Sequence, residues 1–157
     1  MEDEDFMRLA LLEAQKAFDL QEVPVGAVAV LEGKVIASAY NQVESRQDAS
    51  MHAELLCLQR AAQKTGNWRL LGVTLYSTLE PCAMCAGALF SFRVKRVVWG
   101  APDVRQGADG SLTSLLSIEH PIHRIEVRRG VLEELSSNML KLFFKQRRAC
   151  GQSGRNL

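Results

Sequence analysis

Apolar and polar residues alternate along the first part of the chain in two different periods. Residues 3–20 place apolar side chains at helical spacing and acidic side chains in the first turn, where they suit the helix dipole, so the pattern predicts an amphipathic helix. The apolar run over residues 23–31 is typical of a buried strand. A turn at Glu32 and Gly33 then predicts a hairpin, with a second strand over residues 34–40.

Helix and strand patterns continue to alternate over the rest of the chain. We expect a polar loop over residues 41–50, helices over 52–64, 82–92 and 131–148, strands over 73–77, 95–99 and 123–128, and a glycine-containing loop over 101–111. The pattern therefore predicts the α/β class, as a three-layer α/β/α sandwich around about five mostly covered strands. Residues 1–150 would form a single domain and residues 151–157 a polar, disordered tail.

Composition narrows the class of protein. The sequence is 47% hydrophobic and 24% charged, as in soluble globular proteins, and its apolar runs are too short to span a bilayer, so no membrane partner is expected. The chain begins with MEDED, which is acidic, unlike a secretory signal or a transit peptide, and this favours a cytoplasmic location. A net charge of +1 gives no general indication of nucleic-acid binding, so such a partner has to be argued from local clusters.

Two of the four cysteines lie in a motif that is typical of metal binding. The sequence PCAMC over residues 81–85 places Cys82 and Cys85 three residues apart, on one face of a predicted helical turn. Thiolates at this spacing suit zinc, and the positive end of the helix dipole favours the thiolate form. The alternative is a pair of buried structural thiols. A disulfide framework is not expected for a domain of this size in a reducing compartment.

The sequence His52-Ala53-Glu54 supplies a third candidate ligand. A structural zinc site is closed by four protein ligands, whereas a catalytic site has three and an open position for water. We expect no fourth protein ligand among the remaining histidines and cysteines. They are interpreted as surface or core histidines (His120 and His123), a core thiol (Cys57) and a free surface thiol (Cys150). We therefore predict that His52, Cys82 and Cys85 hold one zinc ion beside a water molecule.

Glu54 distinguishes a hydrolytic centre from a structural metal site. As a fourth ligand its carboxylate would block the position for water, so we expect it to act as a general acid and base. It would take a proton from the water, deliver it to a ring nitrogen of the substrate and later protonate the departing amine. The alternative is a first-turn glutamate that only complements the helix dipole, which contributes from a few tenths to about 1 kcal/mol.

The sequence HAE followed by PCxxC is the signature of the zinc nucleobase deaminases. The chain resembles the family of bacterial tRNA-specific adenosine deaminases over nearly its whole length. The matching segments are PVGAV (24–28), Asn41, Asp48, HAE (52–54), TLEPCAMCAGA (78–88), VVWGA (97–101), GADGS (107–111) and FFKQRR (143–148). One departure follows Asp48, where the family has proline and small residues and this chain has Ala49, Ser50 and Met51. Loss of the proline loosens the loop but removes no catalytic atom.

The resemblance implies a cytidine deaminase-like fold, a homodimer with zinc in each subunit, and hydrolytic deamination of adenosine to inosine at the wobble position, the first anticodon position of a tRNA. It also implies a set of substrate-binding residues. Asn41 would contact the target base, and the backbone at Ala53 and Ala83 would help to position it. The anticodon loop would lie beside Phe143, Phe144, Arg147 and Arg148, since aromatic and basic side chains suit a single-stranded loop. The alternatives for these last residues are helix packing for the aromatic pair and a solvated helix end for the basic ones.

Two other functions remain open from the residues of the reacting centre. The same zinc machinery would serve deamination of a free base or nucleoside, such as guanine, cytosine or cytidine. The glycine-rich loop over residues 107–110 and the basic, aromatic C-terminal helix count against this function, because both match the tRNA enzymes. The third hypothesis is a non-catalytic, zinc-stabilised RNA-binding subunit, against which Glu54 argues because structural zinc needs no proton shuttle.

Overall fold

One mixed sheet lies at the centre of residues 1–151, the part of the chain that the computed structural model describes. Its strands are β1 (Gly26–Leu31), β2 (Lys34–Tyr40), β3 (Thr74–Leu79), β4 (Arg96–Ala101) and β5 (Glu126–Arg128), in the order β2-β1-β3-β4-β5. β1 is antiparallel to both β2 and β3, whereas β3, β4 and β5 run parallel to one another. The prediction of a sheet of about five strands is confirmed.

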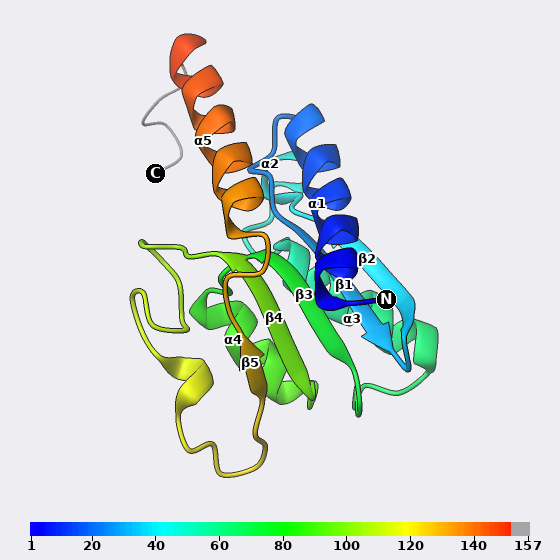
Figure 1. Ribbon diagram of the computed structural model, residues 1–157. Coiled ribbons are helices and arrows are strands. Elements are labelled where there is room, and N and C mark those ends of the chain that lie inside the picture. Colours follow the sequence, from blue (N-terminus) through cyan, green and yellow to red (C-terminus); the bar gives the residue numbers. More distant parts are fainter. Residues whose placement is uncertain (152–157) are drawn as a thin grey trace.

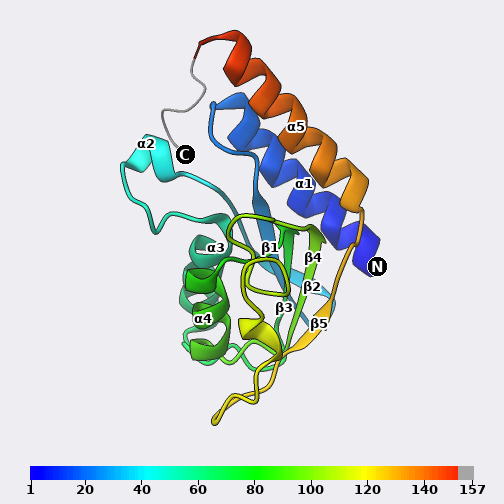
Figure 2. The same ribbon diagram turned by 90° about the vertical axis from the view of Figure 1, so that its left-hand side faces the viewer.

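Helices cover both faces of the sheet (Figure 1 and Figure 2). One face carries α1 (Asp3–Asp19) and α5 (Glu133–Ala149), and the other carries α3 (Ala53–Thr65) and α4 (Ala83–Ser91). Two short elements lie in the loops, namely α2 (Val43–Arg46) and the 3-10 helix η1 (Leu115–Ser117). The three-layer α/β/α arrangement predicted from the sequence is therefore confirmed.

The alternation of side chains along each strand divides the core into two clusters. On the α3 and α4 face, strand residues such as Ala27, Leu75 and Val97 pack with apolar side chains of those helices. The next residue of each of these strands points to the opposite face, where Val28, Tyr76 and Val98 pack against α1. Both faces of the central strands are thus buried, as expected for a covered sheet.

The boundaries of several elements differ from the predicted ones. β1 begins at Gly26 instead of residue 23, because the Val25 amide closes a tight turn onto the Val23 carbonyl at 2.9 Å and Pro24 has no amide to donate. The loop over residues 41–50 contains α2, which the sequence did not predict. α5 begins at Glu133 because Leu132 adopts a left-handed conformation, with φ of 54°.

Two further expectations concern the ends and surfaces of the chain. Residues 152–157 of the expected polar tail lie outside the described residues. Among the helices in the described part of the chain, none has the length and apolarity required to cross a bilayer.

Candidate metal centre and active site

The predicted metal ligands meet where α3 and α4 begin, at the end of the sheet where β3 ends. His52 and Cys82 are the N-cap residues of these two helices, and both have extended backbone angles. Each helix therefore starts one residue later than the sequence pattern indicated. Cys85 lies in the first turn of α4, so that the two thiols share one face of the turn.

The three candidate ligands are close enough to share one ion. The Nδ1 atom of His52 lies 3.5 Å from Sγ of Cys82 and 3.6 Å from Sγ of Cys85. A tetrahedral zinc ion with bonds of about 2.3 Å to sulfur and about 2.05 Å to nitrogen places these atoms about 3.5 Å apart. The geometry of His52, Cys82 and Cys85 thus fits a metal ion of this size, and the group could hold one.

The two thiols have different environments. The pKa of Cys82 is lowered to about 4, because its thiolate accepts hydrogen bonds from Cys85 and His52. The pKa of Cys85 is raised by its hydrogen bond to Cys82 and by burial. A divalent cation would favour loss of the Cys85 proton, because both sulfurs could then ligate as thiolates.

Glu54 lies in the first turn of α3 and is 4% exposed. Burial raises the pKa of its carboxyl group to about 7, and the positive charge of His52 opposes this rise. A carboxyl group that titrates near neutrality can both accept and return a proton, as a general acid and base must do. The charges of His52 and Cys82 both act on the pKa of Glu54, so this carboxyl group lies near the three ligands.

Asn41 is buried at the same end of the sheet and offers an unused acceptor. Its side-chain Nδ2 donates to the Val23 carbonyl at 3.2 Å, and its amide donates to the Val25 carbonyl at 3.0 Å. Its Oδ1 atom is buried and has no hydrogen-bond partner within the described chain. A buried, unpaired oxygen of this kind is available to a ligand. Ala53 and Ala83 are the first residues of α3 and α4, where backbone amides have no partner within the helix.

The C-terminal residues divide into packed and exposed groups. Phe143 is 5% exposed and packs edge-to-face on Phe18, with ring centroids 5.8 Å apart. The guanidinium of Arg147 lies over the Phe143 ring at 5.3 Å. Phe144 is 37% exposed and Arg148 is exposed. The helix-packing alternative thus holds for Phe143, whereas Phe144 and Arg148 are accessible.

His120, His123, Cys57 and Cys150 do not belong to the group of His52, Cys82 and Cys85 in the described part of the chain. His120 stacks on Phe90 with ring centroids 4.3 Å apart, and the ring of His123 bonds to the Val94 carbonyl at 2.7 Å. Burial raises the pKa of the Cys57 thiol, and Cys150 is exposed.

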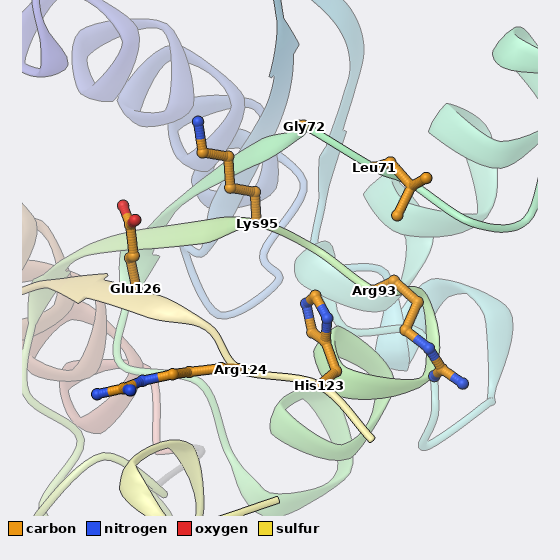
Figure 3. Close-up of a pocket in the computed structure, with 7 residues that line it drawn as sticks. All are labelled: Leu71, Gly72, Arg93, Lys95, His123, Arg124 and Glu126. Atoms are coloured by element: carbon orange, nitrogen blue, oxygen red, sulfur yellow. The ribbon is translucent and has the colours of Figure 1, made fainter. Parts of the chain in front are cut away.

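A cavity of about 600 Å³ lies at the opposite end of the sheet, where β3, β4 and β5 begin (Figure 3). Its polar side chains do not converge. Figure 3 shows Arg93 and Arg124 pointing away from each other, and Lys95 pointing away from both. Arg93 donates to the carbonyls of Phe90 at 2.9 Å and Ser91 at 3.1 Å, so its guanidinium is already engaged. We therefore do not regard this cavity as the active site.

The sequence did not predict the roles of two buried carboxylates that hold loops in place. Glu22 accepts the backbone amides of Glu44 and Ser45 and thereby holds the start of α2. Glu80 accepts backbone amides of the loop that follows β4. The signal in the sequence is weak: each is an isolated acidic residue next to an apolar segment, and its partners lie more than 20 residues away.

Relatives of known function are deaminases. A family model described as MafB19-like deaminase matches residues 1–148. The chain is 48% identical to the tRNA-specific adenosine deaminase of Bacillus subtilis (strain 168), over 94% of this chain and 91% of that relative. It is also 46% identical to the chloroplastic tRNA(adenine(34)) deaminase of Arabidopsis thaliana, over 92% of this chain but only 12% of the plant protein's length.

Solved structures of deaminases are also similar to this chain. A structure from a study of A-to-I editing by tRNA:A34 deaminases at the wobble position of transfer RNA is similar with a TM-score of 0.83 and 41% identity, covering 87% of this chain and 99% of that chain. The guanine deaminase of Bacillus subtilis is similar with a TM-score of 0.63 and 27% identity, covering 95% of both chains.

Proposed function

The chain belongs to the family of tRNA-specific adenosine deaminases, and we propose that it converts adenosine to inosine at the first anticodon position of a tRNA. The observation that carries this proposal is the group of His52, Cys82 and Cys85 with the buried carboxyl of Glu54 beside it. Three protein donors leave one position of a tetrahedral ion open, which favours a hydrolytic centre over a structural one.

We propose that the bound ion is zinc, with one ion in each chain. One imidazole nitrogen and two thiolates form a donor set that zinc favours, and the nitrogen-to-sulfur distances of 3.5 Å and 3.6 Å support this assignment. When bound, the ion supplies Lewis-acid activation of the attacking water. The remaining steps depend on side chains of this chain.

Glu54 moves the protons in the proposed reaction. Its carboxylate takes a proton from the attacking water as the oxygen bonds to C6 of the adenine ring. It delivers this proton to a ring nitrogen, which neutralises the negative charge that attack places on the ring. It then transfers a second proton from the added oxygen to the amino group, so that the C6–N bond breaks and ammonia leaves. The products are inosine and ammonia, and Glu54 returns to its starting state.

Asn41 and the two helix starts form the proposed binding site for the base. The unpaired Oδ1 of Asn41 supports a hydrogen bond with a donor of the substrate, because a buried acceptor that stays unpaired is unfavourable. The backbone at Ala53 and Ala83 lies where two helices present free amides, next to the ligands that they carry. These residues would orient the base toward Glu54.

The proposed macromolecular partner is the anticodon loop of a tRNA, bound by a homodimer. Phe144 and Arg148 support an RNA contact at the end of α5, because an exposed aromatic ring next to a cation suits an unstacked base and its phosphate. Arg147 also belongs to this group, although its guanidinium lies over Phe143. Two copies of the chain would enlarge a basic surface that is modest in one copy, since the net charge of a single chain is +1.

The test is a comparison of substrates. We expect the zinc-loaded protein to form inosine in an anticodon stem-loop with adenosine at the first anticodon position, measured by mass spectrometry of the nucleosides. A stem-loop with adenosine moved to the neighbouring position is the matched control and should remain unchanged. Free adenosine, guanine, cytosine and cytidine are assayed in parallel.

Deamination of a free base is the second candidate, because the chain is also similar to a guanine deaminase. Turnover of guanine without inosine formation in the stem-loop would establish this function and refute the first. The identity of 48% to a tRNA-specific deaminase, against 27% to the guanine deaminase, favours the RNA substrate.

A further inference from the structure

The loop that follows β4, residues 102–111, is attached to the metal-binding end of the sheet through its backbone. Gly107 forms an antiparallel bridge with Cys82, and the Ala108 amide donates to the Pro81 carbonyl at 2.8 Å. Residues 104–106 at the tip of the loop are exposed. The loop therefore lies beside the candidate active site, and its tip is accessible to a bound macromolecule.

One buried carboxylate holds residues 102–111 in place. Glu80 is 1% exposed and lies two residues before Cys82. Its Oε1 accepts the Asp103 amide at 3.0 Å and the Ser111 hydroxyl. Its Oε2 accepts the Asp109 amide at 2.8 Å and the Ser111 amide at 3.3 Å. The negative charge is thus satisfied by loop groups, and none of the salt bridges within residues 1–151 includes Glu80.

The shape of the loop is adapted to this carboxylate. A Cβ atom at Gly107 would lie 2.2 Å from the carboxyl carbon of Glu80, so any other residue at this position would displace the Glu80 carboxylate from its place in the loop. Asp109 holds the other side of the loop. Its carboxylate accepts hydrogen bonds from Nε1 of Trp99 at 2.8 Å and from Nε of Arg129 at 2.7 Å. The loop is therefore held by Glu80, which accepts its backbone amides, and by Trp99 and Arg129, which bind the side chain of Asp109.

We propose that Glu80 is a positioning residue for the deamination, which keeps residues 102–111 in the shape that receives the RNA beside the target adenosine. This inference rests on the proposed function. A loop that is already ordered avoids the entropy loss of ordering during binding, so the apparent affinity for the substrate depends on the fraction of time that the loop is ordered. Glu80 does not touch the reacting atoms, and its effect is on substrate binding instead of on proton transfer.

The test uses Glu80→Gln, which preserves the size of the side chain but offers only one acceptor oxygen. In either orientation, its amide group faces at least one backbone amide that loses its acceptor. We expect amide hydrogen exchange over residues 103–111 to approach that of an unprotected chain. If the loop is then ordered for about a tenth of the time, KM for the anticodon stem-loop rises about tenfold. The values of kcat and the zinc content should stay close to wild type.

Two further variants complete the design. Glu13→Gln is the matched control, because Glu13 is also a buried glutamate but lies on α1, where it pairs with Lys16 at 2.9 Å. It should have wild-type loop exchange and KM. Ser111→Ala removes one donor from an exposed residue, so it should fold even if Glu80→Gln does not, and we expect a KM increase of about threefold.

The outcomes separate this inference from the proposed function. Wild-type loop exchange and KM in Glu80→Gln would overturn the positioning role, as would unchanged values in Ser111→Ala if Glu80→Gln does not fold. A fall in kcat with loss of zinc at unchanged KM would also overturn it, since Glu80 would then support the metal site itself. If the wild-type protein forms no inosine in the stem-loop, the proposed function fails. The exchange measurement still tests whether Glu80 orders the loop.

Discussion

The two ends of the sheet both carry polar and ionisable side chains, but only one of them brings reactive groups together. Where α3 and α4 begin, three donor atoms lie within 4.8 Å of one another, and the Glu54 carboxyl is buried in the first turn of α3. At the opposite end, the side chains of Arg93, Lys95 and Arg124 point apart (Figure 3). The comparison shows that a cavity with nearby charges is not sufficient for an active site. An active site requires side chains whose reactive atoms converge on one point.

The strongest test of this comparison removes one metal ligand. We expect Cys82→Ser to lose zinc, because a serine hydroxyl ligates zinc poorly. Deamination should then fall to the background rate, because no metal ion is present to activate the attacking water. Zinc content by atomic emission and inosine formation are measured on the same preparation. Cys150→Ser changes an exposed thiol outside the group and should retain both. Full zinc retention in Cys82→Ser would show that another residue ligates the metal.

The second test separates metal binding from proton transfer within the same end. We expect Glu54→Gln to retain zinc and to lower kcat by about 10²–10⁴-fold, because glutamine cannot accept and return a proton. The measurements are zinc content and single-turnover deamination of the stem-loop. A rate near that of the wild type would contradict the proposed proton shuttle and leave Glu54 as a first-turn residue that complements the helix dipole.

The metal site was more predictable from the sequence than its surroundings, and the reason is the range of the interactions. Cys82 and Cys85 are three residues apart on one turn, so their proximity follows from helix geometry. His52 joins them through a recognisable combination of residues. The roles of Glu22 and Glu80 depend on backbone amides more than 20 residues away, and no local pattern specifies which amides a buried carboxylate will meet.

The fold shows the same contrast between pattern and detail. The order and type of the main elements followed from the pattern of apolar and polar residues. This pattern is informative because successive residues of each central strand contribute apolar side chains to the two core clusters, one on each face of the sheet. The short helix α2 was missed because its first turn depends on the Glu22 carboxylate, which accepts the amides of Glu44 and Ser45. The late start of α5 was missed because the left-handed angle of Leu132 is not expected of a leucine.

The ionisable groups farther from the metal ligands should contribute stability without contributing to catalysis. Asp3, at the start of α1, accepts two hydrogen bonds from Arg96, at 2.8 Å and 2.7 Å, and also pairs with Arg128. The Arg96 guanidinium holds the pKa of Asp3 well below its usual range. We expect Asp3→Asn to lower the free energy of unfolding by about 1–2 kcal/mol at pH 7, measured by urea denaturation, because these charge-assisted bonds are lost.

The pH dependence of this variant gives the finer test. A carboxyl whose pKa is lowered by folding stabilises the protein above its unfolded pKa, and this stabilisation is lost as the pH falls toward the folded value. The difference between wild type and Asp3→Asn should therefore be constant near neutrality and shrink below about pH 4. The kcat/KM for the stem-loop should stay unchanged, as it should in Arg124→Ala, because Arg124 takes part in none of the salt bridges within residues 1–151. A marked fall in kcat/KM at unchanged zinc content would mean that the two ends of the sheet are coupled. The division between a catalytic end and a structural end would then fail.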